Sequence, residues 1–199
     1  MPEQRNVFQK VSDATGGVIT PANVMDAGAM ALAVWAAPQL NTRKGIKGIA
    51  VSFGADVLDG FVAGMTGTRT EFGSTIDRAG DKVKSAVTAP YIYKYRLAPR
   101  ALLGAVVLQN AANMGAAVYD FFHNETRQIV VEDRDRHAAL ANNVGLGLHL
   151  VGGELARDGY YREEKAARIM GNLIGWGGLA TLGRRTSLKY WQQASSIYR

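Results

Sequence analysis

The sequence contains no cysteine among its 199 residues. Disulfide scaffolds, thiol catalysis, zinc knuckles and cysteine-ligated iron–sulfur clusters are therefore excluded for this chain. Proline is also scarce, with 5 residues, whereas glycine is abundant, with 23. Few prolines and many glycines argue against a chain of loops and linkers, and they favour helices that pack closely through small residues.

Acidic residues are fewer than basic ones, with 17 Asp and Glu against 23 Lys and Arg and a net charge of +6. This balance suits an anionic lipid surface, a phosphorylated substrate or nucleic acid, and it does not choose among them. The first 17 residues carry Glu3 and Asp13 and have no apolar core. We therefore expect neither a signal peptide nor a transit peptide in this stretch.

Long hydrophobic runs are also few. The mean hydropathy is −0.07, which is low for a chain of plain membrane-spanning helices. Among the uncharged stretches, only residues 101–119 reach the roughly 18–20 residues that a hydrocarbon core of about 30 Å requires. Hydropathy alone therefore leaves a soluble protein and a membrane protein equally open.

Helical patterns fill most of the chain, and alternating strand patterns are nearly absent, with residues 128–131 as the one short candidate. The sequence predicts an all-α bundle that forms a single domain over residues 1–199, with a short amphipathic segment near its N-terminal end. A basic, aromatic tail follows the last helix. The six expected helices cover about residues 20–40, 46–65, 72–96, 99–122, 136–157 and 163–182, and the amphipathic segment covers residues 3–13.

Four aspartates stand at helical spacings on either side of the connection between the second and third expected helices. Asp56 and Asp59 are three residues apart, so they share one helix face. Asp77 and Asp81 are four apart and share a face of the next helix. Carboxylates that converge in an apolar bundle repel each other by several kcal/mol unless cations neutralise them. Oxygen ligands with no His or Cys nearby indicate Mg²⁺ or Mn²⁺, and a pair of such ions can clamp a diphosphate. Solvated helix caps or ordinary salt bridges are the other interpretation of this spacing.

The residues around these aspartates resemble the motif of the CDP-alcohol phosphatidyltransferase family, D-x2-D-G-x2-A-R-x8-G-x3-D-x3-D. Seven of its eight fixed positions match, with every spacing kept. At the eighth position, Gly64 stands where the family has arginine. Residues 20–23 are similar to the family's Pro-Asn entry into its first transmembrane helix. The matching motif positions are Asp56, Asp59, Gly60, Ala63, Gly73, Asp77 and Asp81.

The resemblance implies a multi-pass enzyme of the cell membrane, with six transmembrane helices, a dimeric state and an active site that faces the cytoplasm. Such an enzyme moves a phosphatidyl group from CDP-diacylglycerol to an alcohol and releases CMP, in phospholipid biosynthesis. Its partners would be these two substrates, the lipid bilayer and a second copy of the chain, and not nucleic acid. The positive charges between the expected helices do not decide the orientation, so only the resemblance places the site toward the cytoplasm.

The resemblance also implies roles for individual residues. Asp56, Asp59 and Asp77 would bind two Mg²⁺ or Mn²⁺ ions. Asp81 would be both a ligand and the general base that takes the acceptor's proton. Small residues would border the cytidine and the diphosphate, and an amide would help to hold the phosphates; these residues are Gly60, Ala63, Gly73 and Asn23.

Glycine at position 64 leaves the motif without its guanidinium. The loss of one phosphate contact costs about 1.5–3 kcal/mol, roughly ten- to a hundred-fold in rate or affinity. Arg69 or Arg78, in the same loop and helix, would have to bind the phosphate from another direction. A catalytically inactive relative of the family is the alternative that Gly64 leaves open.

The acceptor alcohol is less well indicated. Arg134 and Arg136, before the fifth expected helix, are candidates for binding a phosphate on the acceptor, and a plain surface cluster is the alternative. We prefer a phosphorylated polyol, with glycerol 3-phosphate first, as in the phosphatidylglycerophosphate synthases. The tail after residue 182 is interpreted as an interfacial lipid anchor or as a solvated helix end.

Three functions therefore remain open. The first is a membrane phosphatidyltransferase that uses Mg²⁺ and CDP-diacylglycerol. The second is a soluble or peripheral all-α enzyme that processes a diphosphate with Mg²⁺, which the low hydropathy favours and the spacing of the motif disfavours. The third is a non-catalytic membrane protein of the same fold, which Gly64 suggests.

Overall fold

The computed structural model describes residues 5–123 and 133–195. Every regular element in these two stretches is a helix and neither contains a strand, which confirms the all-α prediction for the described residues. The strand candidate at 128–131 lies outside them. The elements, in chain order, are α1 (Val7–Ala14), α2 (Pro21–Ala36), η1 (Ala37–Gln39), α3 (Arg43–Thr66), α4 (Glu71–Lys94), α5 (Arg100–His123), α6 (Asp133–Arg157), α7 (Tyr161–Gly178), η2 (Leu179–Gly183) and α8 (Arg184–Ser195).

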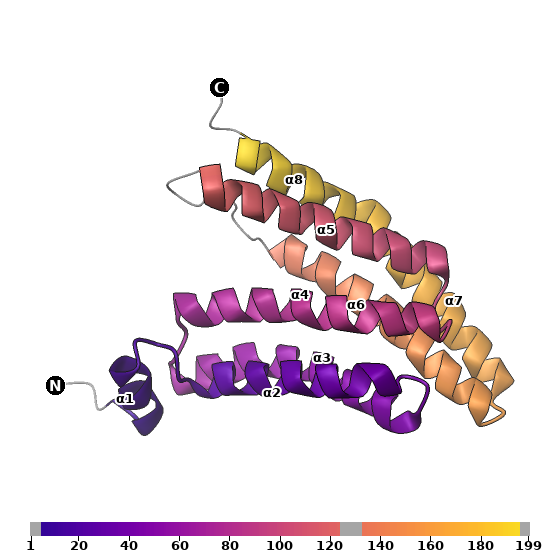
Figure 1. Cartoon of the computed structure of the whole chain (residues 1–199), viewed down its shortest axis with the longest axis horizontal. Coiled ribbons are helices and arrows are strands. Elements are labelled where there is room, and N and C mark those ends of the chain that lie inside the picture. The colour runs from indigo at the N-terminus through magenta and orange to yellow at the C-terminus, as the bar shows by residue number, and fades with distance from the viewer. Residues whose placement is uncertain (1–4, 124–132, 196–199) are drawn as a thin grey trace. The chain divides into compact units, whose positions relative to one another are not determined.

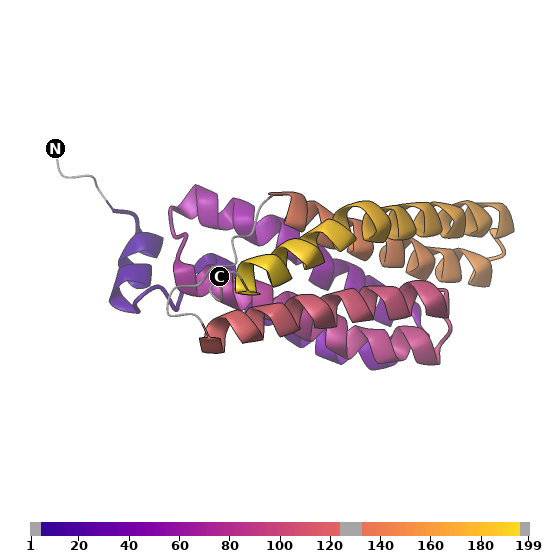
Figure 2. The same cartoon turned by 90° about the horizontal axis from the view of Figure 1, so that it is seen from above.

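The chain forms two compact units, Met1–Tyr95 and Arg96–Arg199. In the first unit, α2 packs against both α3 and α4, and the three helices run alongside one another (Figure 1). In the second unit, α6 packs against α7, and α5 packs against α8, as the view from above also shows (Figure 2). The motif therefore lies within the first unit.

Threonine caps fix where the helices of the first unit begin. The side chain of Thr20 accepts a hydrogen bond from the N–H of Asn23 at 3.1 Å, and Pro21 follows in the first turn. Thr42 and Thr70 cap α3 and α4 in the same way. Such a cap satisfies a backbone N–H that has no partner within its own helix. The helix start that we predicted at Thr20 and Pro21 is therefore confirmed.

Small residues let α2 and α3 approach each other closely. Ala33 and Ala36 are fully buried, and a Cβ atom added at Gly48 would lie 2.7 Å from the Cβ of Ala36. The hydroxyl of Ser52 donates a hydrogen bond to the carbonyl of Ala29 at 2.7 Å, which joins α3 to α2. Close small-residue contacts with hydroxyl bridges are typical of helices that pack inside membranes.

Glycines also form the contact between α6 and α7. A Cβ atom at Gly145 would lie 2.8 Å from the Cα of Gly175, and one at Gly171 would lie 2.8 Å from the carbonyl oxygen of Gly145. At Gly178, a Cβ atom would lie 2.7 Å from the Cβ of Ala141. The two backbones are therefore in direct contact at these positions, and the glycines allow it.

We expect Gly145→Ala to destabilise the second unit by about 1–3 kcal/mol, because the new methyl group would overlap the backbone of α7. Gly147→Ala is the matched control, since a Cβ atom there meets nothing within 4 Å. Alanine at that position should be neutral or stabilise α6 by about 0.5–1 kcal/mol. Thermal unfolding of both variants in detergent measures the difference, and equal midpoints would contradict the close contact.

The tail that we expected after residue 182 is the helix α8, which packs against α5, and its place at a membrane interface stays a prediction. The hydroxyl of Ser187 in α8 donates a hydrogen bond to Oδ1 of Asn113 in α5 at 2.7 Å. The rings of Tyr119 and Trp191 are 6.2 Å apart. The polar and aromatic residues of this segment therefore attach α8 to α5.

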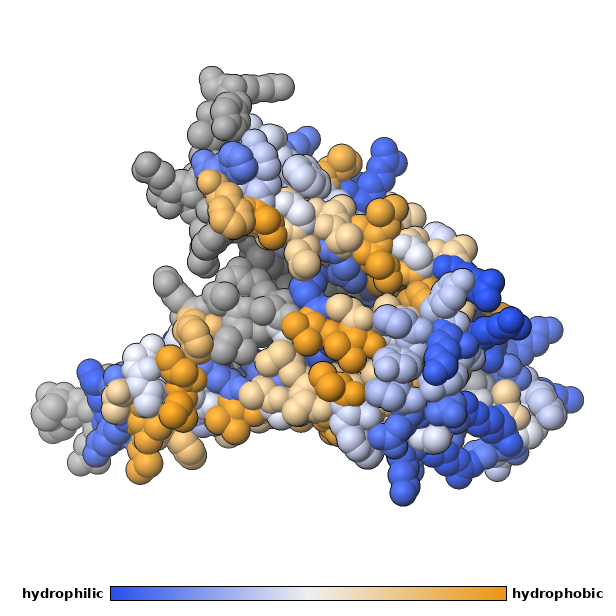
Figure 3. All heavy atoms as spheres, in the orientation of Figure 1, coloured by the Kyte–Doolittle hydropathy of each residue, from blue (hydrophilic) through white to orange (hydrophobic). Residues whose placement is uncertain are grey.

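Two helices of the described residues, α3 and α5, are long and apolar enough to cross a membrane, over Arg43–Thr66 and Arg100–Asp120. This finding rests on length and composition alone, and it does not confirm the six transmembrane helices that we expected. Only 31% of the apolar 18-residue stretch of α3 is buried in the structure, and only 22% of that of α5. Apolar residues are correspondingly exposed on the molecular surface (Figure 3). The large apolar side chains that α3 and α5 expose include Val51, Leu58, Phe61, Met65, Val107, Leu108, Met114, Val118 and Phe122.

Candidate functional site

The two aspartate pairs lie on consecutive helices of the first unit. Asp56 and Asp59 are in the second half of α3, and Asp77 and Asp81 are in the first half of α4. Residues 67–70 connect the two helices. The side chains of Asp56 and Asp77 lie outside the described residues, so the convergence of all four carboxylates remains a prediction.

Asp59 and Asp81 have different surroundings. Asp59 is buried, with 6% exposed, and its Oδ1 accepts a hydrogen bond from the N–H of Gly60. Asp81 has 36% of its side chain exposed, and its Oδ1 lies 3.6 Å from Nζ of Lys84. A buried carboxylate requires hydrogen bonds or a cation to offset the loss of water. Asp59 is therefore held within the fold by the N–H of Gly60, while Asp81 is accessible to a second molecule.

Asn23 and Gly73, two predicted substrate-binding residues, lie together where α2 and α4 begin. A Cβ atom at Gly73 would be 2.8 Å from Oδ1 of Asn23, so the glycine leaves room for the amide. The Nδ2 of Asn23 donates hydrogen bonds to the carbonyls of Gly17 and Val18, at 3.1 and 2.9 Å. Thr70 also donates to the Gly17 carbonyl, at 3.3 Å. The amide thus binds the segment before α2 and lies next to the start of α4, and its contact with phosphate remains a prediction.

Position 60 of α3 is open to the surface. Gly60 is exposed, and a Cβ atom there would meet nothing within 4 Å. Ala63 is buried, with 9% exposed. The surface of α3 at position 60 is therefore free of side chains, one residue after Asp59.

The guanidinium of Arg69 lies beside Gly64. A Cβ atom added at Gly64 would be 3.4 Å from Nη2 of Arg69. Gly67 caps the C-terminal end of α3, and its φ of 65° is in the left-handed region and turns the chain back toward α4. The side chain of Arg78, the other candidate, lies outside the described residues. A guanidinium is thus present next to the position where the motif has arginine, although it comes from the loop.

The family model for CDP-alcohol phosphatidyltransferase matches residues 18–160. This range covers most of the chain, and it contains α2 to α6 with the whole motif. The chain belongs to the CDP-alcohol phosphatidyltransferase family. It is therefore a transferase of substituted phosphate groups that acts in phospholipid biosynthesis. No curated protein and no solved structure gives a significant match to the chain.

Membership in the CDP-alcohol phosphatidyltransferase family favours the first of the three functions over a soluble diphosphate-processing enzyme. Members of this family are membrane proteins, and they generally depend on divalent cations. The matched range ends before α7, so α7, η2 and α8 lie outside it. The match does not distinguish the phosphatidylglycerophosphate synthases from other branches of the family.

Three of the buried charged residues that the structure describes were missed by the sequence analysis, namely Asp26, Lys84 and Asp120. Asp26 in α2 is 4% exposed, and Lys84 in α4 is 1% exposed. Asp26 is the one charged residue between positions 14 and 42, so its isolation was an available signal. Lys84 stands in a polar stretch that resembles a solvated helix face, and nothing local marked it as buried.

The structure describes the side chains of only some of the residues that we predicted to bind the metal ions and the acceptor. Among the described side chains, no group of three or more His, Cys, Asp or Glu residues is close enough to hold a metal ion. The side chains of Asp56 and Asp77 lie outside this part of the structure, so the metal site stays a prediction. The side chains of Arg134 and Arg136 also lie outside the described residues, and the two positions fall in the first turn of α6.

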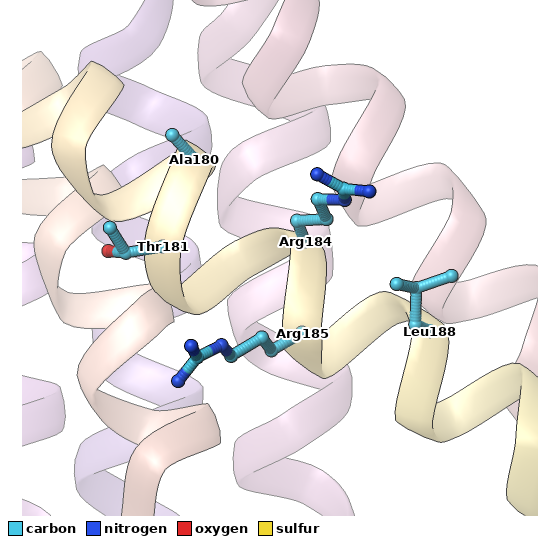
Figure 4. Close-up of a pocket in the computed structure, with 5 residues that line it drawn as sticks. All are labelled: Ala180, Thr181, Arg184, Arg185 and Leu188. Carbon is cyan, nitrogen blue, oxygen red and sulfur yellow. The ribbon is translucent and has the colours of Figure 1, made fainter.

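A shallow cleft of about 530 Å³ lies at the junction of η2 and α8, in the second unit of the transferase. It is lined by Ala180, Thr181, Arg184, Arg185 and Leu188. Figure 4 shows that the side chains of Arg184 and Arg185 leave the helix in different directions. They therefore do not converge on one anion, and no residue of the motif lines the cleft.

Proposed function

We propose that this transferase is an integral membrane enzyme that moves a phosphatidyl group from CDP-diacylglycerol to the hydroxyl of a small phosphorylated alcohol and releases CMP. The observation that carries the proposal is the spacing of the aspartates and small residues on α3 and α4, within the range that the family model matches. The exposed apolar side chains of α3 and α5 support its place in the bilayer. We further propose six transmembrane helices, a site that faces the cytoplasm and a homodimer.

The donor set of the motif suits Mg²⁺ or Mn²⁺. Asp59 is a buried carboxylate, and carboxylate oxygens are the ligands that these ions prefer. Asp56, Asp59, Asp77 and Asp81 would together hold two ions. When bound, the ions would neutralise the diphosphate and stabilise the charge on the departing CMP.

Asp81 is the proposed general base. Its side chain is 36% exposed, so an acceptor hydroxyl can reach it. As the acceptor oxygen forms a bond with the phosphorus of the phosphatidyl group, its proton moves to the carboxylate of Asp81. The bond between that phosphorus and the bridging oxygen breaks, and CMP departs with the electron pair.

The nucleotide would lie along the open side of α3. Gly60 offers space there, and the buried Ala63 keeps the adjoining surface small. Gly73 and Asn23 would shape the end of the site near α4. Arg69 would bind a phosphate oxygen in place of the missing arginine at position 64, because its guanidinium lies beside that position.

We expect Arg69→Ala to lower kcat/KM for CDP-diacylglycerol by roughly ten- to a hundred-fold, the cost of one charged phosphate contact. Gly64→Arg in the Arg69→Ala background should restore much of this loss, because it returns a guanidinium to the same neighbourhood. Arg162→Ala, at an exposed position of α7, is the control. If Arg69→Ala behaves like this control, Arg69 does not contact the substrate.

The acceptor is proposed to be glycerol 3-phosphate, with Arg134 and Arg136 binding its phosphate. The test supplies the detergent-solubilised chain with Mg²⁺, CDP-diacylglycerol and one of glycerol 3-phosphate, inositol phosphate, serine or a second lipid. Mass spectrometry then identifies the lipid product. Phosphatidylglycerophosphate as the main product supports the proposal, and another phosphatidyl lipid would redirect the acceptor assignment.

A further inference from the structure

Lys84 is a buried cation next to the proposed general base. It is 1% exposed, and its Nζ lies 3.6 Å from Oδ1 of Asp81, one helical turn earlier on α4. The same Nζ lies 6.0 Å from the ring centroid of Phe53 on α3. Phe53 is one turn before Asp56 on that helix. The ammonium is therefore in the space between α3 and α4, on the side of the aspartate motif.

A fixed positive charge at this place acts on both the carboxylates and any metal ion that they bind. It attracts Asp81 and so offsets part of the repulsion between the carboxylates when no ion is present. It also repels a divalent ion at the same carboxylates, and this repulsion is weakly screened because the ammonium is away from water. The two effects have the same consequence, which is weaker metal binding.

We infer that Lys84 is a positioning residue that holds Asp81 and sets the metal affinity of the site, by competing with a divalent cation for its carboxylate. The inference rests on the proposed function, since it requires Asp81 to be a ligand. The contact that carries the inference is the ion pair between Lys84 and Asp81. Its charge acts on the site by attracting Asp81 and by repelling a cation bound there.

The test measures Mn²⁺ binding to the full chain in detergent by electron paramagnetic resonance, without substrate. Lys84→Met removes the charge and keeps a side chain of similar length, and Lys84→Gln is a second uncharged variant in case the first does not fold. Lys84→Arg keeps the charge. Lys94→Met is the matched control, because Lys94 is on the same helix but about 15 Å further along it, in the last turn.

The uncharged variants should bind Mn²⁺ about tenfold more tightly than the parent, or more, while Lys84→Arg and Lys94→Met stay close to it. A purely structural role would give weaker or unchanged binding together with a lower unfolding temperature. Unchanged or weaker Mn²⁺ binding in a folded uncharged variant would therefore overturn the inference.

Asp59→Asn separates the failure of this inference from the failure of the proposed function. If it removes Mn²⁺ binding while Lys84→Met leaves the affinity unchanged, only the role of Lys84 is wrong. If Asp59→Asn does not affect Mn²⁺ binding, the metal site is not at the motif, and the proposed function and the inference both fail.

Discussion

Asp81→Asn is expected to lower turnover by roughly 10²–10⁴-fold, the usual contribution of a general base. The amide keeps an oxygen that can coordinate a metal ion weakly, but it cannot take the acceptor's proton. CDP-diacylglycerol should still bind in the presence of Mg²⁺, because the other three carboxylates can hold at least one ion. Single-turnover kinetics together with equilibrium binding of CDP-diacylglycerol measure the two effects separately.

Two outcomes would contradict this assignment for Asp81. If the variant loses CDP-diacylglycerol binding as completely as Asp59→Asn, then Asp81 acts chiefly as a ligand. If turnover stays within about tenfold of the parent, another group takes the proton. The partial exposure of Asp81, against the burial of Asp59, is the structural reason to expect different behaviour from the two residues.

Asp59→Asn is expected to weaken Mn²⁺ and Mg²⁺ binding by roughly 10²–10³-fold, and turnover should fall with it. The reason is that Asp59 is a buried anion, and its replacement removes a charged ligand that water does not substitute. A chelator should abolish the activity of the parent, and added Mg²⁺ or Mn²⁺ should restore it.

Asp120→Asn is the matched control for this variant. Asp120 is also a buried aspartate, with 3% exposed, but it lies on α5, in the second unit and outside the motif. Its replacement should leave Mn²⁺ affinity unchanged, even if the unfolding temperature falls. Equal Mn²⁺ affinities in Asp59→Asn and the parent would show that Asp59 is not a ligand.

Local signals in the sequence predicted much of the fold. Capping residues such as Thr20 and Thr70 mark helix starts because they satisfy backbone groups within a few residues, which a sequence displays directly. The aspartate spacing likewise placed each pair on one helix. The helix after residue 182 was missed because its packing on α5 depends on partners such as Asn113, far away in the sequence.

The candidate site was predicted less completely for the same reason. The approach of Arg69 to Gly64 depends on the left-handed turn at Gly67, which the spacing of the motif does not reveal. The burial of Lys84 depends on the neighbouring helices, since a lysine in a polar stretch is ordinarily solvated. The division of the chain into two units likewise follows from contacts between helices, which the hydrophobic pattern of each helix does not contain.

The most direct test of the central proposal is the release of CMP from CDP-diacylglycerol by the purified full chain in detergent, with Mg²⁺ and glycerol 3-phosphate. We expect CMP and a new phosphatidyl lipid to form in equal amounts, with both products lost on chelation and recovered on addition of Mg²⁺. A folded protein that binds Mn²⁺ but releases no CMP with any alcohol of the panel would contradict the proposal. That result would identify the chain as an inactive member of its family.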